Sequence, residues 1–231
     1  LLMGGCVQPS LAPNINHSIK NILAKLNIEV LESSQGECCG ALDQHLAASS
    51  DALKKVKRNI DNWISKLDSG VEAIISSASG CGVMIKDYPN LFEESDPYYE
   101  KSLLISSKTK DIAEFLVNQD LSSLKLKELN IAYHEPCTMQ HGQKLGGLVE
   151  SILSEFGYIK KQIKDSHICC GSAGTYSVFE TKIANQLRSN KIDNLNASKP
   201  KMIVTSNIGC LMHLQKGSSI PVKHWVELLD V

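Results

Sequence analysis

The hydrophobic positions of the chain form two similar series of short apolar runs and amphipathic helical segments. In the first series an apolar start, LLMGG, precedes residues 14–27, whose isoleucines and leucines recur at helical spacing. A β-branched run at 28–32, a long amphipathic stretch at 41–67 and a strand pattern ending at Cys81 follow. The pattern predicts strand, helix, strand, one long helix or two shorter ones, and strand.

The second series repeats this order. It predicts a strand at 130–137, a helix at 146–157, a strand at 158–164, a helix at 177–197 and a strand at 201–210. Alternation of strands and helices is typical of α/β units with parallel strands. The predicted fold is therefore α/β, with two tandem pseudo-symmetric units of the βαβαβ type and two small parallel sheets.

A polar segment with no strong periodic face, DLSSLKLKEL at 120–129, separates the two series. We place the boundary near Asn118. The prediction is a first cysteine-rich domain over residues 1–117 and a second over residues 118–231.

The cysteines repeat with the same spacing in both series. Cys6 and Cys38, like Cys137 and Cys169, are 32 positions apart, and both CC pairs are followed by glycine. The two series are thus offset by about 131 positions, which indicates an internal duplication. The eight cysteines are Cys6, Cys38, Cys39, Cys81, Cys137, Cys169, Cys170 and Cys210.

The predicted strands place the cysteines of each half together. Ligands of parallel α/β units gather outside the carboxyl ends of the strands, and all four cysteines of each half follow a strand there. A helix N-terminus favours the thiolate, which is the form that binds metal. Each half therefore carries a candidate metal site of four thiols at the strand ends.

Composition narrows the function classes. The 231 residues are 42% hydrophobic and 21% charged, and 24 Lys and Arg nearly balance 25 Asp and Glu, so charge gives no reason to expect nucleic acid or anionic lipid as a partner. No apolar run approaches the roughly 18 residues of a membrane span, and the start lacks a signal peptide's charged region. We expect a cytoplasmic protein. Because it opens on what looks like the end of a strand, we also expect a preceding N-terminal segment.

Disulfides, inert burial and structural zinc compete with an iron–sulfur site for the cysteines. A disulfide between Cys38 and Cys39 would be strained, because adjacent Cα atoms are about 3.8 Å apart and disulfides prefer about 4.4–6.8 Å. Inert burial does not account for eight thiols in matched register. A structural zinc in each half is the serious competitor. Two adjacent sulfurs nevertheless fit a polynuclear iron–sulfur cluster better than one tetrahedral ion, because each sulfur can bind a different iron.

Several motifs carry a resemblance to a known family. The segments GCVQPS, CCGAL, SASGCGVM, CCGSAGTYSV and PVKHWVELLD are similar to the two cysteine-rich CCG domains of the iron–sulfur subunit of glycolate oxidase (glycolate dehydrogenase), a family related to the heterodisulfide reductase B subunit and the lactate-utilisation iron–sulfur proteins. The resemblance covers nearly the whole chain.

The resemblance implies an oxidoreductase subunit that transfers electrons. It implies iron–sulfur clusters of the [4Fe–4S] type, with zinc as an alternative in one site, held by the eight cysteines. Flavin subunits that carry FAD would oxidise glycolate or a similar 2-hydroxy acid, and electrons would pass to a membrane or quinone acceptor. The complex would place this chain at the periphery of the inner membrane.

The chain departs from the family at two points. The ferredoxin-like module with CxxCxxCxxxCP repeats, which begins the full-length family subunit, is absent from this sequence. The related motif also ends in CxxC, but here Met84 follows Cys81 and His213 follows Cys210 at the place of the fifth cysteine. Four cysteines still suffice for a [4Fe–4S] cluster, and His213 is a candidate ligand in the second half because imidazole replaces thiolate in some clusters.

The two halves differ in polarity. With the offset of 131, Met3 corresponds to His134, and His141 and His167 also lie near the second cysteine group. We expect the second site to be the one that is redox-active or handles protons, and the first to be the degenerate or zinc-bearing one.

Two functions compete with electron transfer. One is a zinc-stabilised module that docks on the flavin subunits without passing electrons. The other is a thiol–disulfide redox subunit of the heterodisulfide-reductase kind that uses the vicinal cysteines, which requires a thiol with a depressed pKa.

Overall fold

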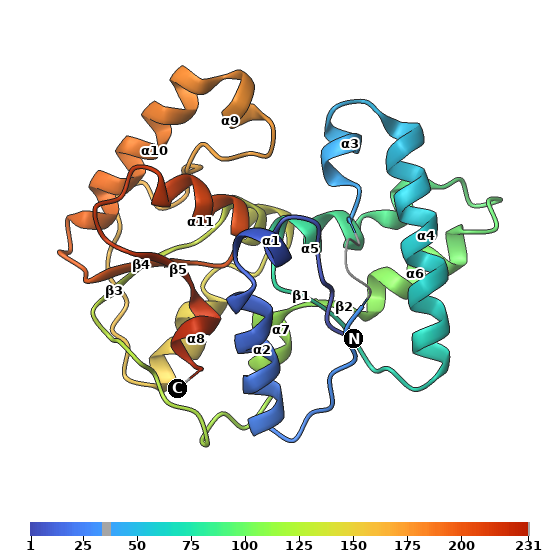
Figure 1. Ribbon diagram of the computed structural model, residues 1–231, viewed down its shortest axis with the longest axis horizontal. Coiled ribbons are helices and arrows are strands. Elements are labelled where there is room, and N and C mark those ends of the chain that lie inside the picture. Colours follow the sequence, from blue (N-terminus) through green and yellow to red (C-terminus); the bar gives the residue numbers. More distant parts are fainter. Residues whose placement is uncertain (34–37, 231) are drawn as a thin grey trace.

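The computed structural model describes residues 1–33 and 38–230 and shows two lobes side by side, one for each half of the sequence (Figure 1). The first lobe lies on the right of this view and the second on the left. Each lobe contains a small parallel sheet with helices around it, so the predicted α/β fold with two pseudo-symmetric units is confirmed.

The first sheet has two named strands, β1 (Ile74–Ser76) and β2 (Thr109–Asp111), which pair in parallel. Leu2 extends this sheet, because it forms parallel bridges to both Ile75 and Glu32. The helices of the first half are α1 (Gln8–Leu11), α2 (Asn14–Lys25), α3 (Ala41–His45), α4 (Ser49–Asp68), α5 (Ser79–Lys86), η1 (Tyr88–Leu91), α6 (Tyr99–Lys108) and α7 (Ile112–Leu116).

The second sheet has the order β3-β4-β5, all parallel. Its strands are β3 (Ile131–His134), β4 (Met202–Thr205) and β5 (Val222–His224). The helices of the second half are the π-helix η2 (Thr138–Gly142), α8 (Leu148–Glu155), α9 (Tyr176–Phe179), α10 (Thr181–Asn196), α11 (Ile208–Gln215) and the 3₁₀-helix η3 (Trp225–Leu228).

The duplication extends beyond the cysteines into a strand and helix that the hydrophobic pattern did not predict. The sequences KDIAEFL and KHWVELL form β2 with α7 and β5 with η3. Both junctions carry a capping box, with Asp111 and Glu114 in the first half and His224 and Glu227 in the second. At both helix starts, side chains thus accept hydrogen bonds from backbone N–H groups that have no partner within the helix.

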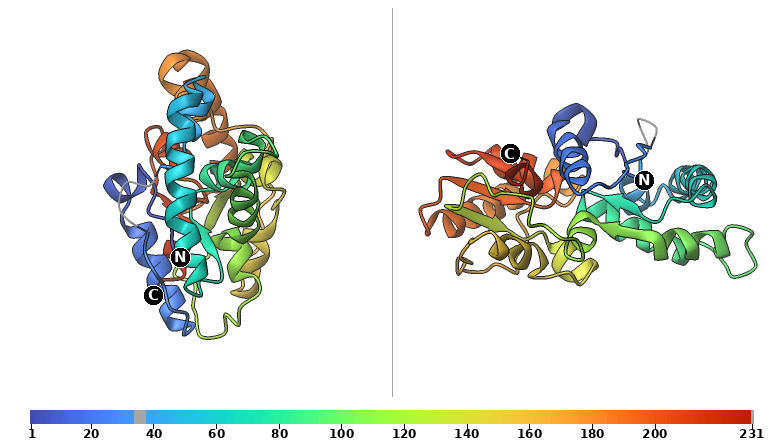
Figure 2. Two further views of the ribbon diagram at one scale, coloured as in Figure 1. Left: turned by 90° about the vertical axis from the view of Figure 1, so that its right-hand side faces the viewer. Right: turned by 90° about the horizontal axis from the view of Figure 1, so that it is seen from below.

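The two halves exchange their last segments. η3, at the end of the second half, packs on α2 of the first half, and α7, at the end of the first half, packs on α8 of the second. Asn21 of α2 also donates to both carboxylate oxygens of Asp230, at 3.2 and 3.0 Å. Figure 2 shows α2 between the two lobes when the molecule is seen from below. One hydrophobic core accordingly contains buried residues of both halves, including Ile19, Ile112 and Trp225.

Some predicted elements differ from the observed ones. The strand predicted at 158–164 is wrong: these residues pair with no strand among the described residues. Only Tyr158 among them is buried, because the segment is rich in lysine. The strand predicted at 28–32 is reduced to the single bridge at Glu32. The stretch 41–67 forms two helices, α3 and α4.

The predicted boundary near Asn118 falls directly after α7, and in the segment that follows, Leu121 and Leu124 are buried in the shared core. Among the helices of the described residues, none combines the length and apolarity needed to cross a bilayer.

Candidate metal centres

Each CC pair is held by a tight turn that needs glycine. Gly40 and Gly171 have φ angles of +87° and +91°, a region that favours glycine because other residues clash there. The Gly40 N–H donates to the Sγ of Cys38 at 3.5 Å, and the Gly171 N–H donates to the Sγ of Cys169 at 3.3 Å. The turns therefore place the first thiol of each pair at a backbone donor, which stabilises the thiolate.

The first cysteine group brings four thiols from three segments into contact. Cys38 neighbours Cys6, which precedes α1, while Cys39 neighbours Cys81 in α5. Hydrogen bonds from Cys39 and Cys6 lower the pKa of Cys38 to about 2, and the same bonds raise the pKa values of those two donors. Cys38 is thus the thiolate of this group.

The second cysteine group has the same arrangement. The Sγ atoms of Cys137 and Cys169 are 3.9 Å apart, and Cys170 neighbours Cys210 in α11. Hydrogen bonds from Cys137 and then Cys170 lower the pKa of Cys169 to about 2. The neighbouring thiol of Cys170 is also the largest cause that lowers the pKa of Cys210 to about 6, and neighbouring His134 adds to this effect. The second group therefore favours thiolates on Cys169 and Cys210.

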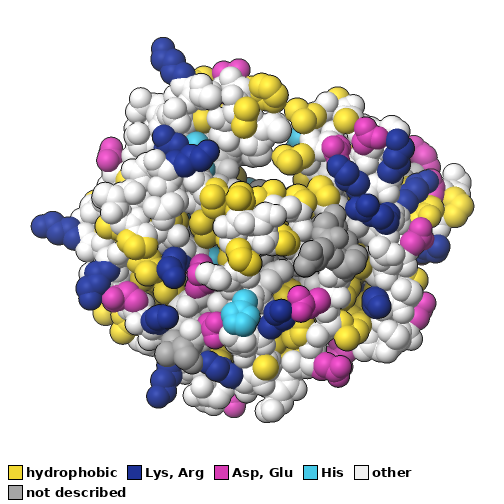
Figure 3. Space-filling model, viewed as in Figure 1, with side chains coloured by type: hydrophobic (Ala, Val, Ile, Leu, Met, Phe, Trp, Pro, Cys, Tyr) yellow, Lys and Arg dark blue, Asp and Glu magenta, His cyan; other side chains and the backbone are white. Residues whose placement is uncertain are grey.

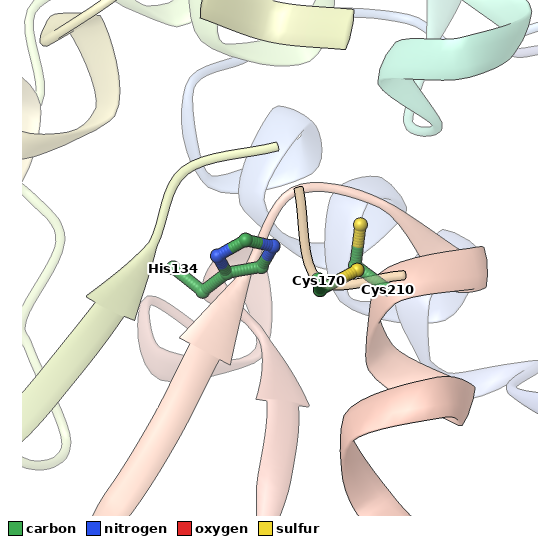
Figure 4. A group of neighbouring side chains, drawn as sticks. All are labelled: His134, Cys170 and Cys210. Atoms are coloured by element: carbon green, nitrogen blue, oxygen red, sulfur yellow. The ribbon is translucent and has the colours of Figure 1, made fainter. Parts of the chain in front are cut away.

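A histidine joins the second group. His134 ends β3, is only 2% exposed, and its ring points toward the sulfurs of Cys170 and Cys210 (Figure 4). One ligand atom from each of these three residues lies within 4.8 Å of the others. Within the part of the chain that the structure describes, the Nε2 of His134 has no hydrogen-bond partner. At the corresponding place the first group has Met3, which is also buried.

The other histidines named from the sequence lie differently. The Nε2 of His213 is 3.2 Å from the carbonyl oxygen of Ala184, and burial lowers the pKa of this imidazole. His213 does not belong to the group formed by His134, Cys170 and Cys210, so its role as a ligand stays a prediction. His141 and His167 are exposed.

The surroundings of the second group are more polar than those of the first. A cavity of about 150 Å³ beside His134 is lined among others by Glu135, Glu150 and Lys191. Lys191 is 2% exposed, and its Nζ donates to the carbonyl oxygens of Asp165 and Ser166 at 2.7 and 3.2 Å. At the offset of 131 the first half has Gly4, Ile19 and Ile60 in place of Glu135, Glu150 and Lys191.

Four observations indicate that the residues present fit an iron–sulfur centre. Each half offers four neighbouring sulfurs, two of them adjacent in sequence, and a backbone N–H donates to one of them. In each half at least one thiol has a strongly lowered pKa, and thiolate is the form that binds iron. All eight predicted cysteines are thus brought together in two groups of four, and their binding of metal stays a prediction.

One residue of this region is not singled out by the sequence pattern. His134 is named from the sequence as the counterpart of Met3, but Lys191 lies within a predicted amphipathic helix and is not named. Comparison of the two halves does mark both residues. His134 stands where the first half has Met3, and Lys191 stands where it has Ile60, so two buried apolar positions have become titratable.

The sequence of the chain is similar to a known domain family and to several known proteins. Residues 2–86 and 131–215 each match the CCG family, described as "Cysteine-rich domain". The chain is 41% identical to the glycolate oxidase iron–sulfur subunit of Escherichia coli, over all of this chain and 57% of that protein. It is 25% identical to the probable glycolate oxidase iron–sulfur subunit of Bacillus subtilis, over 92% of this chain and 48% of that protein.

A shorter kind of relative matches over nearly its full length. Lactate utilization protein A of Bacillus licheniformis is 26% identical over 97% of this chain and 96% of that protein. The chain therefore spans about half the length of the two glycolate oxidase subunits and almost all of the lactate utilization protein. The family matches cover both cysteine groups, and the predicted resemblance is confirmed: the chain belongs to the CCG cysteine-rich domain family, of which it carries two copies.

Proposed function

We propose that the chain is an iron–sulfur electron-transfer subunit of an oxidoreductase that oxidises glycolate or a similar 2-hydroxy acid. The observation that carries the proposal is the repeated group of four thiols, each built on a CC pair and a glycine turn. The names of the relatives from E. coli and B. subtilis support the iron–sulfur role and the substrate class.

The residues of this chain hold and shield the centres. Cys6, Cys38, Cys39 and Cys81 would bind the first centre, and Cys137, Cys169, Cys170 and Cys210 the second. An iron–sulfur cluster, of the [4Fe–4S] type in our proposal, supplies reversible one-electron transfer when it is bound. The Gly40 and Gly171 N–H groups stabilise negative charge on their sulfurs, and the buried Cys39, Cys170 and Cys210 keep water from one side of each site.

The partners in this proposal are flavin subunits that carry FAD and perform the hydroxy-acid oxidation, so that the acid–base chemistry lies outside this chain. Electrons would leave toward a membrane or quinone acceptor, and the complex would place this cytoplasmic chain at the periphery of the inner membrane.

Exposed apolar side chains near both CCG turns support docking of a partner. We call them the apolar rim: Leu42, Leu46, Tyr176, Val178, Phe179 and Ile183. They lie on α3, α9 and α10 or next to them, and Figure 3 shows hydrophobic side chains on both sides of a hollow between these parts. Interfaces that include buried apolar anchors are typical of protein partners.

Metal analysis tests the proposed cofactor. Iron, zinc and acid-labile sulfide are measured per chain in anaerobically purified protein and in two matched variants, Cys39→Ser and Cys170→Ser. We expect iron and sulfide in nearly equal amounts, with about half lost in each variant. Zinc without sulfide would instead favour the zinc-stabilised docking module, and turnover of a disulfide without any metal would favour the thiol–disulfide subunit.

Binding to purified flavin subunits tests the docking surface. Phe179→Asp places a charge in the apolar rim, where Phe179 is 72% exposed, and we expect it to weaken binding at least tenfold. Ile159→Asp is the matched control, because Ile159 is 80% exposed but lies outside the rim. Equal binding of both variants would show that the rim is not the docking site.

A further inference from the structure

The end of β3 differs chemically from its counterpart in the first half. His134 ends β3 beside the second cysteine group, while Met3 occupies the corresponding place beside the first. Both side chains are buried, with exposed fractions of 2% and 3%. A buried imidazole needs partners for its nitrogen atoms, whereas a thioether does not.

The described residues 1–33 and 38–230 offer no hydrogen-bond partner for one of these nitrogens. The Nε2 of His134 is buried and has no hydrogen-bond partner among the described residues, and leaving a buried polar atom unpaired is destabilising. Thr205 is the residue paired with His134 across the β3–β4 ladder, and its buried Oγ1 also has no hydrogen-bond partner in the described ranges. Two polar atoms at neighbouring strand ends thus lack partners at the edge of the cysteine group.

The ring is placed as a ligand would be. It points at Cys170 and Cys210, and the three ligand atoms lie within 4.8 Å of one another (Figure 4). The other candidate, His213, already has its Nε2 next to the Ala184 carbonyl oxygen. His134 is therefore better placed than His213 to supply a nitrogen ligand.

We propose that His134 binds the metal centre of the second cysteine group through Nε2, beside Cys170 and Cys210 and in place of one of the four thiolates of that group. The inference rests on the proposed function, because it assumes a metal centre in this group. It makes the two centres of the chain chemically different: the first group offers only sulfur, and the second offers sulfur and one imidazole nitrogen.

The two centres should differ in reduction potential. A neutral imidazole adds no negative charge to an iron–sulfur centre, and imidazole ligation raises its reduction potential relative to thiolate ligation. Lys191 lies near the sulfurs of the second group and adds positive charge there, while the first half has Ile60. The second centre is therefore the stronger electron acceptor of the two.

Nitrogen coupling measured by pulsed electron paramagnetic resonance tests the assignment. The full chain is prepared with ¹⁵N-labelled histidine and with its centres loaded and reduced. We expect a ¹⁵N coupling of the size given by a directly bound imidazole. It should vanish in His134→Met and in His134→Cys, while iron and sulfide contents stay near those of the wild type.

The His134→Cys variant adds a second readout. It replaces a neutral ligand by a thiolate, so we expect the reduction potential of the second centre to fall while that of the first stays unchanged. His141→Gln is the control, because His141 is exposed on η2, and it should keep both the coupling and the potential. Circular dichroism of each variant checks that the fold is kept.

Two results would overturn the inference. One is a loaded wild-type chain without ¹⁵N coupling, and the other is a coupling that persists in His134→Met or disappears in His213→Gln instead. Neither result contradicts the proposed function, because iron and sulfide are still bound. A wild-type chain that takes up no iron or sulfide would overturn the proposed function, and this inference with it.

Discussion

The Nε2 of His224 lies 2.9 Å from the carbonyl oxygen of Ser77, a residue 147 positions earlier in the chain. This contact joins the end of β5 in the second half to the residue that follows β1 in the first. His224 is fully buried, and burial lowers the pKa of its imidazole to about 4. The neutral ring therefore helps to hold the halves together.

The first prediction concerns stability in mild acid. The pKa of His224 is below its unfolded value of 6.5, so the unfolded chain binds more protons between about pH 4 and 6.5. The contribution of His224 is present above pH 6.5 and is lost as the pH falls toward 4, by at most about 3 kcal/mol. Urea unfolding at several pH values measures it. His224→Gln should remove this acid dependence, and His17→Gln, at an exposed site, should not.

The second prediction concerns Asp111, which occupies the place of His224 in the first capping box. Asp111 is 1% exposed, and burial raises the pKa of its carboxyl to about 6. Between about pH 4 and 6 the folded protein binds more protons than the unfolded chain, so this group lowers stability as the pH rises, by at most about 3 kcal/mol.

Asp111→Asn should abolish that loss, because the amide does not titrate and still offers an oxygen to the Ala113 N–H at the helix start. Urea unfolding between pH 4 and 7 follows the effect. An unchanged slope in the variant would mean that the carboxyl of Asp111 titrates normally in the folded protein.

The third prediction compares three glycines with positive φ. A Cβ at Gly171 would lie 2.5 Å from the backbone oxygen of Ala184, while a Cβ at Gly40 would lie 3.3 Å from that of Ala52. Gly70 has a φ of +101° but nothing within 4 Å of its Cβ position, so Gly70→Ala measures the conformational cost alone, about 1 kcal/mol.

We expect Gly171→Ala to cost about 3 kcal/mol or more, with Gly40→Ala between the other two variants, because a backbone clash adds to the conformational strain. Thermal unfolding ranks the three. The Gly171 variant should also hold less iron in the second site, since its turn carries Cys169 and Cys170. Equal destabilisation of all three variants would show that the turn adjusts without cost.

The fourth prediction concerns Lys191. Its two bonds to the carbonyl oxygens of Asp165 and Ser166 fasten the segment that leads to Cys169. Lys191→Ile introduces the residue found at the corresponding position of the first half, Ile60. It should lower the free energy of unfolding by about 1–3 kcal/mol, because two carbonyl oxygens lose a buried donor. Faster amide exchange of residues 163–168 should accompany it. Lys182→Ile is the control, at an exposed position of the same helix.

The duplication and the two thiol groups are predictable because their signals are local. Spacing of cysteines along the chain and strand patterns before them suffice to place four thiols at one sheet edge. The strand prediction at 158–164 rests on Tyr158, Ile159 and Ile163, but Ile159 is 80% exposed. A few apolar residues do not make a strand where none of the described strands pairs with the segment.

The contacts between the halves are not predictable from periodicity. Neither the packing of η3 on α2 nor the His224 to Ser77 bond leaves a repeating signal in the sequence, because each joins residues far apart in the chain. The repeat of KDIAEFL in KHWVELL is a local signal that could have located β2 and β5. Burial of His134 depends on where β3 sits in its sheet, so it required the structure.

The exchange of α7 and η3 between the halves bears on how such a chain can arise. The last segment of the second half, η3, covers α2 of the first half, and the last segment of the first half, α7, covers α8 of the second. Such reciprocal contacts are those of a twofold dimer. A protein with only one of these units would leave that helix face uncovered unless a second copy supplied the missing segment. Gene fusion of such a dimer keeps the reciprocal contacts and frees the two metal sites to diverge, as Met3 and His134 have done.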